Sequence, residues 1–106
     1  MFSRIVTMHL KPNRVAEFTK TLEERVLPVL QKQEGFKDVV SFVSPDGFEA
    51  IAISLWDRKG NAEAYSSTAY PQVLQTLTEL LVEKPQVKMY DVATSTFHKF
   101  GAKATL

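Results

Sequence analysis

The strongest constraint on the fold comes from residues 48–70, where the apolar pattern changes partway along the stretch. Residues 48–56 (FEAIAISLW) are apolar and rich in β-branched side chains, which predicts a strand that ends at Trp56. After a polar turn, residues 61–67 have the composition of a short helix, which should break before Pro71. The strand needs partner strands, and the helix needs a sheet to pack on, so this stretch predicts a layered α and β protein.

Three further stretches have the character of strands, and two have the period of helices. Residues 2–10, 37–44 and 86–100 are rich in β-branched and aromatic side chains, which predicts strands. The helical stripes recur at three- and four-residue steps: Val15, Phe18, Leu22, Val26 and Val29 in the first helix, and Val73, Leu74, Leu77, Leu80 and Leu81 in the second. Pro28 lies late in the first helix and removes a backbone hydrogen bond, so we expect a kink or a break there.

These elements occur in the order βαββαβ, with the second helical region split in two. Right-handed crossovers then give a four-stranded antiparallel sheet with the helices on one face, which is a ferredoxin-like α+β sandwich. A chain of 106 residues has the size of one domain. We place this domain at residues 1–100 and expect residues 101–106 to be a C-terminal tail.

Both faces of the predicted sheet are apolar. In residues 48–56, Ala50, Ala52, Ser54 and Trp56 would share one face, and Ile51, Ile53 and Leu55 the other. An antiparallel sheet with one wet face should instead alternate between apolar and polar residues. The helices can cover only one face, so we expect a homodimer in which two sheets pack together as a dimeric α/β barrel. The alternative is a monomer with an exposed apolar face, which would be prone to aggregation.

The composition argues against several classes of partner. Lys and Arg number 13 against 12 Asp and Glu, and these charges are spread along the chain, so nucleic acid and anionic membranes are not expected partners. The chain has no cysteine, which excludes disulfides and thiolate chemistry. It shows neither a signal-peptide pattern nor an apolar run long enough to span a bilayer. We therefore expect a cytoplasmic protein.

Four segments carry a resemblance to a known family. They are Leu10-Lys-Pro12 after the first strand, Gln33-Glu-Gly-Phe36 before the second, Leu55-Trp56-Asp57 at the end of the third, and the spaced set Ala62, Tyr65, Ser67 and Tyr70. Over about residues 2–98 the chain resembles the antibiotic biosynthesis monooxygenase-like family of dimeric α/β-barrel proteins. The resemblance implies this fold. Its members include cofactor-independent quinol or polyphenol oxygenases, haem-degrading monooxygenases and isomerase-like proteins.

The resemblance to the haem-degrading members is poor at the positions that matter. Their strand asparagine, helix tryptophan and axial histidine would fall near Val6, Ala64 and Leu74 of this sequence. None of these side chains can ligate iron or donate the required hydrogen bond. The two histidines of the chain have no carboxylate at ligand spacing. We therefore expect no haem, no other cofactor and no metal.

Five side chains are candidates for a site. His9 is the candidate for proton transfer by its intrinsic pKa, although we favour a structural role for it. If Val6 and Met8 face the helices, His9 faces the partner subunit instead. The other candidates are large amphipathic side chains that could wall a pocket for a flat phenolic ring: Trp56, Tyr65, Tyr70 and Tyr90. Ordinary core packing is the alternative for each of them taken singly.

Two charged residues, Arg4 and Asp91, lie inside apolar strands. Either could place a charge in a pocket, but the usual interpretation is a residue at a sheet end that reaches solvent. The chain lacks a nucleophile elbow, a phosphate-binding loop and a dinucleotide-binding glycine pattern.

The leading hypothesis is a cofactor-independent monooxygenase that acts on a small aromatic or quinol-like metabolite. The alternatives are a non-catalytic dimeric module that binds a small ligand, and an isomerase of a small metabolite.

Overall fold

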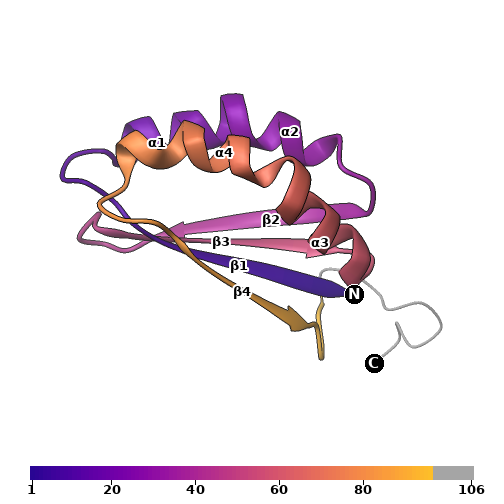
Figure 1. Ribbon diagram of the computed structural model, residues 1–106. Coiled ribbons are helices and arrows are strands. Elements are labelled where there is room, and N and C mark those ends of the chain that lie inside the picture. Colours follow the sequence, from indigo (N-terminus) through magenta and orange to yellow (C-terminus); the bar gives the residue numbers. More distant parts are fainter. Residues whose placement is uncertain (97–106) are drawn as a thin grey trace.

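The computed structural model describes residues 1–96 as one antiparallel sheet with a helical layer on one face (Figure 1). The elements in chain order are β1 (Phe2–His9), α1 (Val15–Thr21), η1 (Leu22–Val26), α2 (Leu27–Gln31), β2 (Phe36–Val43), β3 (Glu49–Trp56), α3 (Lys59–Thr68), α4 (Tyr70–Leu77), η2 (Thr78–Leu80) and β4 (Gln86–Asp91). The strand order is β2-β3-β1-β4. The predicted ferredoxin-like α+β fold is therefore confirmed.

Strand β1 pairs with β3 on one side and with β4 on the other, both antiparallel. Its pairing with β3 runs from Phe2 opposite Trp56 to His9 opposite Glu49. Strands β2 and β3 form a hairpin whose turn includes Gly47 at a φ of 79°. That conformation suits glycine because a Cβ atom would crowd the backbone there.

The two helical segments lie side by side above the sheet in Figure 1. The first segment is irregular where the sequence predicts a kink, because η1 is a π-helical turn in which the Leu27 N–H bonds the Leu22 carbonyl five residues back. Pro28 then lies in the first turn of α2, where the backbone N–H that proline lacks is not needed for a helical hydrogen bond. The second segment breaks between α3 and α4, next to Pro71, as the sequence predicts.

The last strand is shorter than the sequence suggests. Strand β4 ends at Asp91, whereas its β-rich composition predicts a strand to residue 100. The reason is the partner strand: Asp91 pairs with Phe2, and the backbone of Met1 offers one further bond, to the Val92 N–H, before β1 runs out. Residues 97–100 of the predicted strand and the predicted tail at residues 101–106 lie outside the described residues.

The side chains of β1 separate into a buried and an open set. Val6 and Met8 are buried under the helices, whereas Ile5 and Thr7 are partly exposed and His9 is exposed. Apolar side chains of the neighbouring strands share the open face with Ile5, namely Val40, Phe42, Ile51, Ile53 and Leu55. Figure 1 shows no helix of the described chain on that face. No helix within residues 1–96 is long and apolar enough to cross a membrane.

Trp56 is fully buried at the end of β3 and joins the sheet to α3. Its ring stacks on Tyr65 at 5.2 Å between centroids and meets Phe36 edge-on at 5.6 Å. Its indole N–H donates a hydrogen bond of 2.9 Å to the Ser54 hydroxyl, so the polar edge of the ring is also satisfied.

We predict that Trp56→Ala lowers the free energy of unfolding by about 3–5 kcal/mol, as for other buried tryptophans. Trp56→Phe should cost much less because most of the buried apolar area is kept. Denaturant unfolding of both variants measures the two losses. A melting temperature that barely moves in Trp56→Ala would contradict the structural role.

Gly35 and Gly47 form a matched pair for a second prediction. Both have a φ of 79°, but a Cβ on Gly35 would collide with Asp57 and Asn61, whose side chains are joined by a hydrogen bond of 2.8 Å. A Cβ on Gly47 would meet only the Val15 side chain, at 3.2 Å.

We therefore expect each alanine variant to lose about 1–2 kcal/mol to left-handed backbone strain. Gly35→Ala should lose about 1–3 kcal/mol more, because it also displaces packed neighbours. Urea unfolding of the two variants provides the comparison. Equal losses would show that the contact with Asp57 and Asn61 is unimportant.

Candidate functional site

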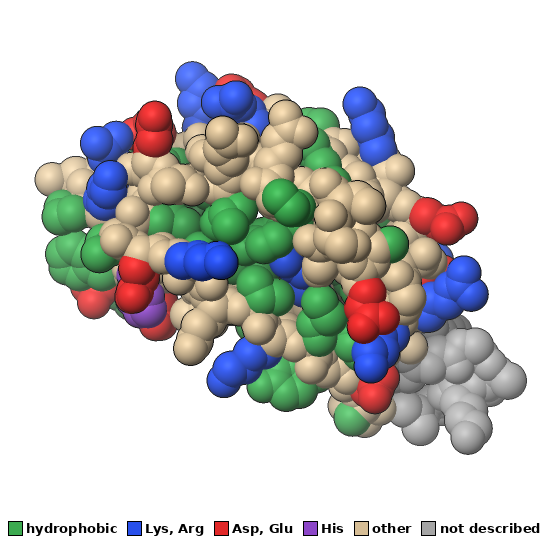
Figure 2. All heavy atoms as spheres, viewed as in Figure 1, with side chains coloured by type: hydrophobic (Ala, Val, Ile, Leu, Met, Phe, Trp, Pro, Cys, Tyr) green, Lys and Arg blue, Asp and Glu red, His purple; other side chains and the backbone are tan. Residues whose placement is uncertain are grey.

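A cavity of about 200 Å³ lies between the sheet and the helical layer. Figure 2 shows hydrophobic side chains gathered around a hollow in this side of the molecule. The cavity is lined from every layer: by Arg4, Val6 and Met8 of β1, Val39 and Ser41 of β2, Ala52 and Ser54 of β3, Leu22, Glu23, Val26, Leu27 and Leu30 of η1 and α2, and Tyr65, Tyr70, Val73 and Leu77 of α3 and α4.

The sheet provides the floor of this cavity, and the floor carries small side chains where room is needed. Ala52 lies directly opposite Val6, and Ser54 directly opposite Arg4, in the β1–β3 pairing. Ser41 continues the row on β2, opposite Ala52. Because alanine and serine extend little above a strand, the helices can close over the sheet without filling the space between.

Arg4 is the charged group at one end of the cavity. It lies in the middle of the sheet on β1, and only 3% of its surface is exposed. Its Nε donates a hydrogen bond of 2.8 Å to the Ser66 hydroxyl of α3. Its guanidinium carbon lies 3.9 Å from the centre of the Tyr70 ring and 5.1 Å from that of Tyr65, within the range of cation–π contacts.

The charge of Arg4 has no carboxylate partner within residues 1–96. Burial lowers the pKa of Arg4, and attraction to Tyr65 and Tyr70 partly offsets that effect. An arginine nevertheless stays protonated in proteins, so the cavity holds a fixed positive charge. Burial also raises the pKa of Tyr65 to about 12, against the opposing influence of Arg4, so this hydroxyl is neutral near pH 7.

The structure brings three of the predicted aromatic residues together. Trp56, Tyr65 and Tyr70 form a continuous row, with the Tyr65 and Tyr70 centroids 6.0 Å apart. Only the two tyrosines line the cavity, because Trp56 lies behind Tyr65. Trp56 therefore supports the wall and does not itself face a bound molecule.

The other two predicted residues lie on the open face of the sheet. Tyr90 is 51% exposed, and its neighbour across the strands is Ser3, on the side away from the helices. His9 lies between two carboxylates, with Nε2 3.6 Å from Glu49 and Nδ1 3.3 Å from Glu83. The sheet separates both residues from the cavity, so neither joins the tyrosine cluster.

Two charged residues of the cavity wall were not among the five candidates. For Arg4 the sequence left two interpretations open, a charge in a pocket and a sheet-end residue that reaches solvent; the second, which was preferred, is wrong, since Arg4 is buried among tyrosines. The available signal was its alternation with Val6 and Met8, which places all three on the helix-facing side. Glu23 does not belong to the apolar stripe of the first predicted helix and was not considered as a site residue, but it lines the cavity from η1. Within residues 1–96, no group of three or more His, Cys, Asp or Glu could hold a metal ion.

Comparison with known proteins supports the fold and not a particular reaction. No protein-family model and no curated protein matches this sequence. Solved structures do match in three dimensions. A proposed antibiotic biosynthesis monooxygenase from Bordetella bronchiseptica aligns with a TM-score of 0.74 and 18% identity, over 88% of this chain and 97% of that chain.

Two further structures extend the comparison. A monooxygenase from the ActVA-Orf6 gene of Streptomyces coelicolor, in complex with the ligand Nanaomycin D, aligns with a TM-score of 0.76 and 15% identity, over 89% of this chain and 88% of that chain. A proposed antibiotic biosynthesis monooxygenase from Nitrosomonas europaea aligns with a TM-score of 0.72 and 14% identity, over 89% of this chain and all of that chain. The fold that the sequence resemblance implies for the single chain is thus confirmed: this chain has the fold of the antibiotic biosynthesis monooxygenase proteins, and the dimeric barrel stays a prediction.

Proposed function

We propose that this protein is a cofactor-independent monooxygenase that oxidises a small aromatic or quinol-like molecule in the cavity between the sheet and the helices. One observation carries the proposal. The cavity is apolar along most of its length and ends in two tyrosines and a buried arginine. An apolar cavity with a few convergent polar groups is the usual form of a small-molecule site.

The size of the cavity limits the substrate. A dry protein cavity of about 150 Å³ can hold benzene, so about 200 Å³ suits one substituted ring or two fused rings. Apolar walls such as Val6, Met8 and Val73 would contact the faces of the ring. The hydroxyls of Tyr65 and Tyr70 would fix its oxygen atoms, since a phenol needs hydrogen-bond partners when it is buried.

The chemistry would draw its electrons from the substrate. A hydroquinone and one dioxygen molecule together contain the atoms of one hydroxyquinone and one water molecule. The substrate anion donates electrons to dioxygen, one oxygen atom enters the ring, and the other leaves as water with the two hydrogens that the substrate loses. Arg4 would favour the anion by its charge, since an opposite charge nearby lowers the pKa of a phenol.

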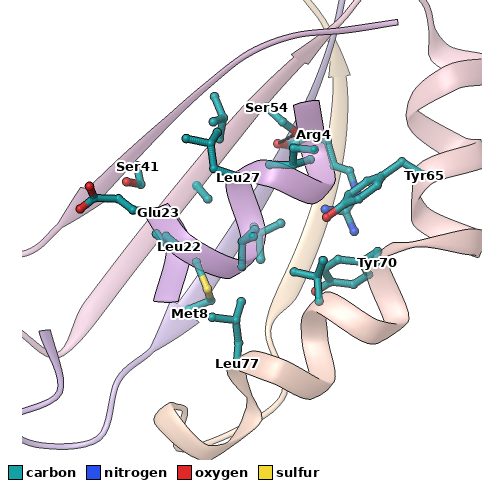
Figure 3. Close-up of a pocket in the computed structure, with 16 residues that line it drawn as sticks. Arg4, Met8, Leu22, Glu23, Leu27, Ser41, Ser54, Tyr65, Tyr70 and Leu77 are labelled. Atoms are coloured by element: carbon teal, nitrogen blue, oxygen red, sulfur yellow. Dashed lines mark hydrogen bonds between the residues drawn. The ribbon is translucent and has the colours of Figure 1, made fainter. Parts of the chain in front are cut away.

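The phenolic proton also needs an acceptor. Tyr65 and Arg4 are both protonated near pH 7, so neither can accept a proton. Glu23 is the carboxylate that lines the cavity within residues 1–96, but it is exposed and lies at the end away from Arg4 (Figure 3), so the proton of a hydroxyl held beside Arg4 would pass to a water molecule. Within residues 1–96 no histidine lines the cavity, which favours the second candidate function, a ligand-binding module that carries out no reaction.

We also propose that the open face of the sheet packs against the same face of a second copy. Val40 and Phe42 lie on that face with 42% and 53% of their surfaces exposed, next to Ile5, Ile51 and Ile53. Such a contiguous apolar surface is unusual on a monomer. A second copy would cover it with a self-complementary partner.

We predict that the protein consumes oxygen when it is mixed with substituted hydroquinones. Arg4→Met should slow this consumption at least about tenfold, because the substrate anion loses its countercharge. His9→Gln is the control and should react like the wild type, since the sheet separates His9 from the cavity. An oxygen electrode measures the rates after subtraction of autoxidation. No uptake across the panel would leave the ligand-binding module as the function.

We predict a homodimer at micromolar concentration, measured by sedimentation equilibrium. Phe42→Lys should shift the mass toward that of the monomer, because it places a charge on the face that would be buried. Phe48→Lys is the matched control: Phe48 is 51% exposed, but it lies in the turn before β3. A wild-type protein that sediments as a monomer would contradict the proposed packing.

A further inference from the structure

The cavity holds a positive charge, that of Arg4, which no carboxylate within residues 1–96 neutralises. Arg4 is almost wholly buried, and no carboxylate within residues 1–96 lies at ion-pair distance from it. Ser66 occupies its Nε, while Tyr65 and Tyr70 contact the guanidinium through their rings. A buried charge is normally paired, because burial removes it from water. An unpaired one in a cavity wall points to a partner that comes from outside.

The cavity is polarised along its length. Figure 3 shows Arg4 directed toward Tyr65 and Tyr70 at one end, with Glu23 and Ser41 at the other end. The wall between them is almost entirely apolar. An anionic group that entered beside Glu23 would be repelled there and attracted to the Arg4 end. The arrangement therefore favours one orientation for a ligand with a single negative charge.

We infer that the cavity is a binding site for an aromatic carboxylate, with the carboxylate on the terminal nitrogens of Arg4 and the ring against the apolar wall. Nε donates to Ser66, and Tyr70 is also a hydrogen-bond partner of the guanidinium, so the carboxylate would take the remaining N–H groups of the two terminal nitrogens. The inference deepens the proposed function, on which it rests for the place of the ligand. It adds that the negative charge paired with Arg4 belongs to a carboxylate of the substrate, in place of a phenolate.

A carboxylate fits this site better than a phosphate does. The planar fork of a guanidinium matches the two oxygens of a carboxylate. A phosphate monoester carries close to two charges near neutral pH, and its site usually offers several donors. Among the described residues, Arg4 is the single cationic side chain in this wall. The single positive charge of Arg4 therefore matches the single negative charge of a carboxylate.

Isothermal titration with 2-naphthoate and 2-naphthylmethanol tests the inference. The two probes have nearly the same shape and differ in charge. We expect 2-naphthoate to bind wild-type protein at least about tenfold more tightly than 2-naphthylmethanol, given the strength of a desolvated charge pair. Arg4→Met should remove that preference and leave the affinity for 2-naphthylmethanol within about threefold of the wild type. Equal affinity of wild-type protein for the two probes would overturn the inference.

Two controls separate lost recognition from lost folding. Ser66→Ala keeps the charge of Arg4 and should retain the preference for 2-naphthoate. Thermal unfolding and circular dichroism establish that Arg4→Met is folded before it is titrated. If Arg4→Met does not fold, Arg4→Lys replaces it: a point charge should keep part of the preference, because it cannot make the bidentate contact. A preference unchanged in folded Arg4→Met would contradict the inference.

The titration and the oxygen assay can each give a negative result without the other. Binding of 2-naphthoate requires no turnover, and the hydroquinone panel requires no carboxylate. A charge preference without oxygen uptake would support the carboxylate site and remove the monooxygenase. Oxygen uptake without a charge preference would support the monooxygenase and remove the carboxylate site.

Discussion

The stacking of Trp56 on Tyr65 connects the sheet to the helical layer, and the rest of the site depends on it. Trp56 ends β3, so its position is set by the strand pairing. Tyr65 lies on α3 and packs against that fixed ring, which sets where α3 runs over the sheet. Tyr70 follows at the start of α4, and both tyrosines then meet Arg4. The position of the cavity end is therefore fixed by a chain of contacts that begins at a strand terminus.

Burial of the Arg4 guanidinium lowers the stability of the fold. Taking a cation out of water is unfavourable by several kcal/mol even after the surroundings relax, and a desolvated cation–π contact returns about 2 kcal/mol or somewhat more. The hydrogen bond to Ser66 offsets a further part. An apolar residue at this position of β1 would pack between Phe2 and Val6 without such a cost. Stability therefore does not explain why this position holds an arginine. A bound ligand whose negative charge pairs with the guanidinium would explain it.

Much of the fold could be predicted from the sequence, because periodicity reports on burial. The alternation in residues 48–56, the helical stripes and Pro28 placed the strands, the helices and the irregular turn. The end of β4 could not be predicted from periodicity, because it depends on where its partner strand β1 begins. The site was harder to predict because it also depends on contacts between residues that are far apart in the sequence. Tyr65 and Tyr70 could be identified by side-chain type and their place beside the short helix, but Arg4 becomes a site residue only through tyrosines more than sixty positions away.

Alternation along β1 also explains how one sheet can serve two surfaces. Arg4, Val6 and Met8 face the cavity, and Ile5, Thr7 and His9 face away from it. A shift of one residue in the pairing would exchange the two sets and place Arg4 on the apolar open face. The β1–β3 register runs without a break from Phe2 to His9, so the two sets stay separate along the whole strand. A second copy on the open face would be separated from the cavity by the sheet itself. Association and ligand binding can therefore act on opposite sides of the same strand.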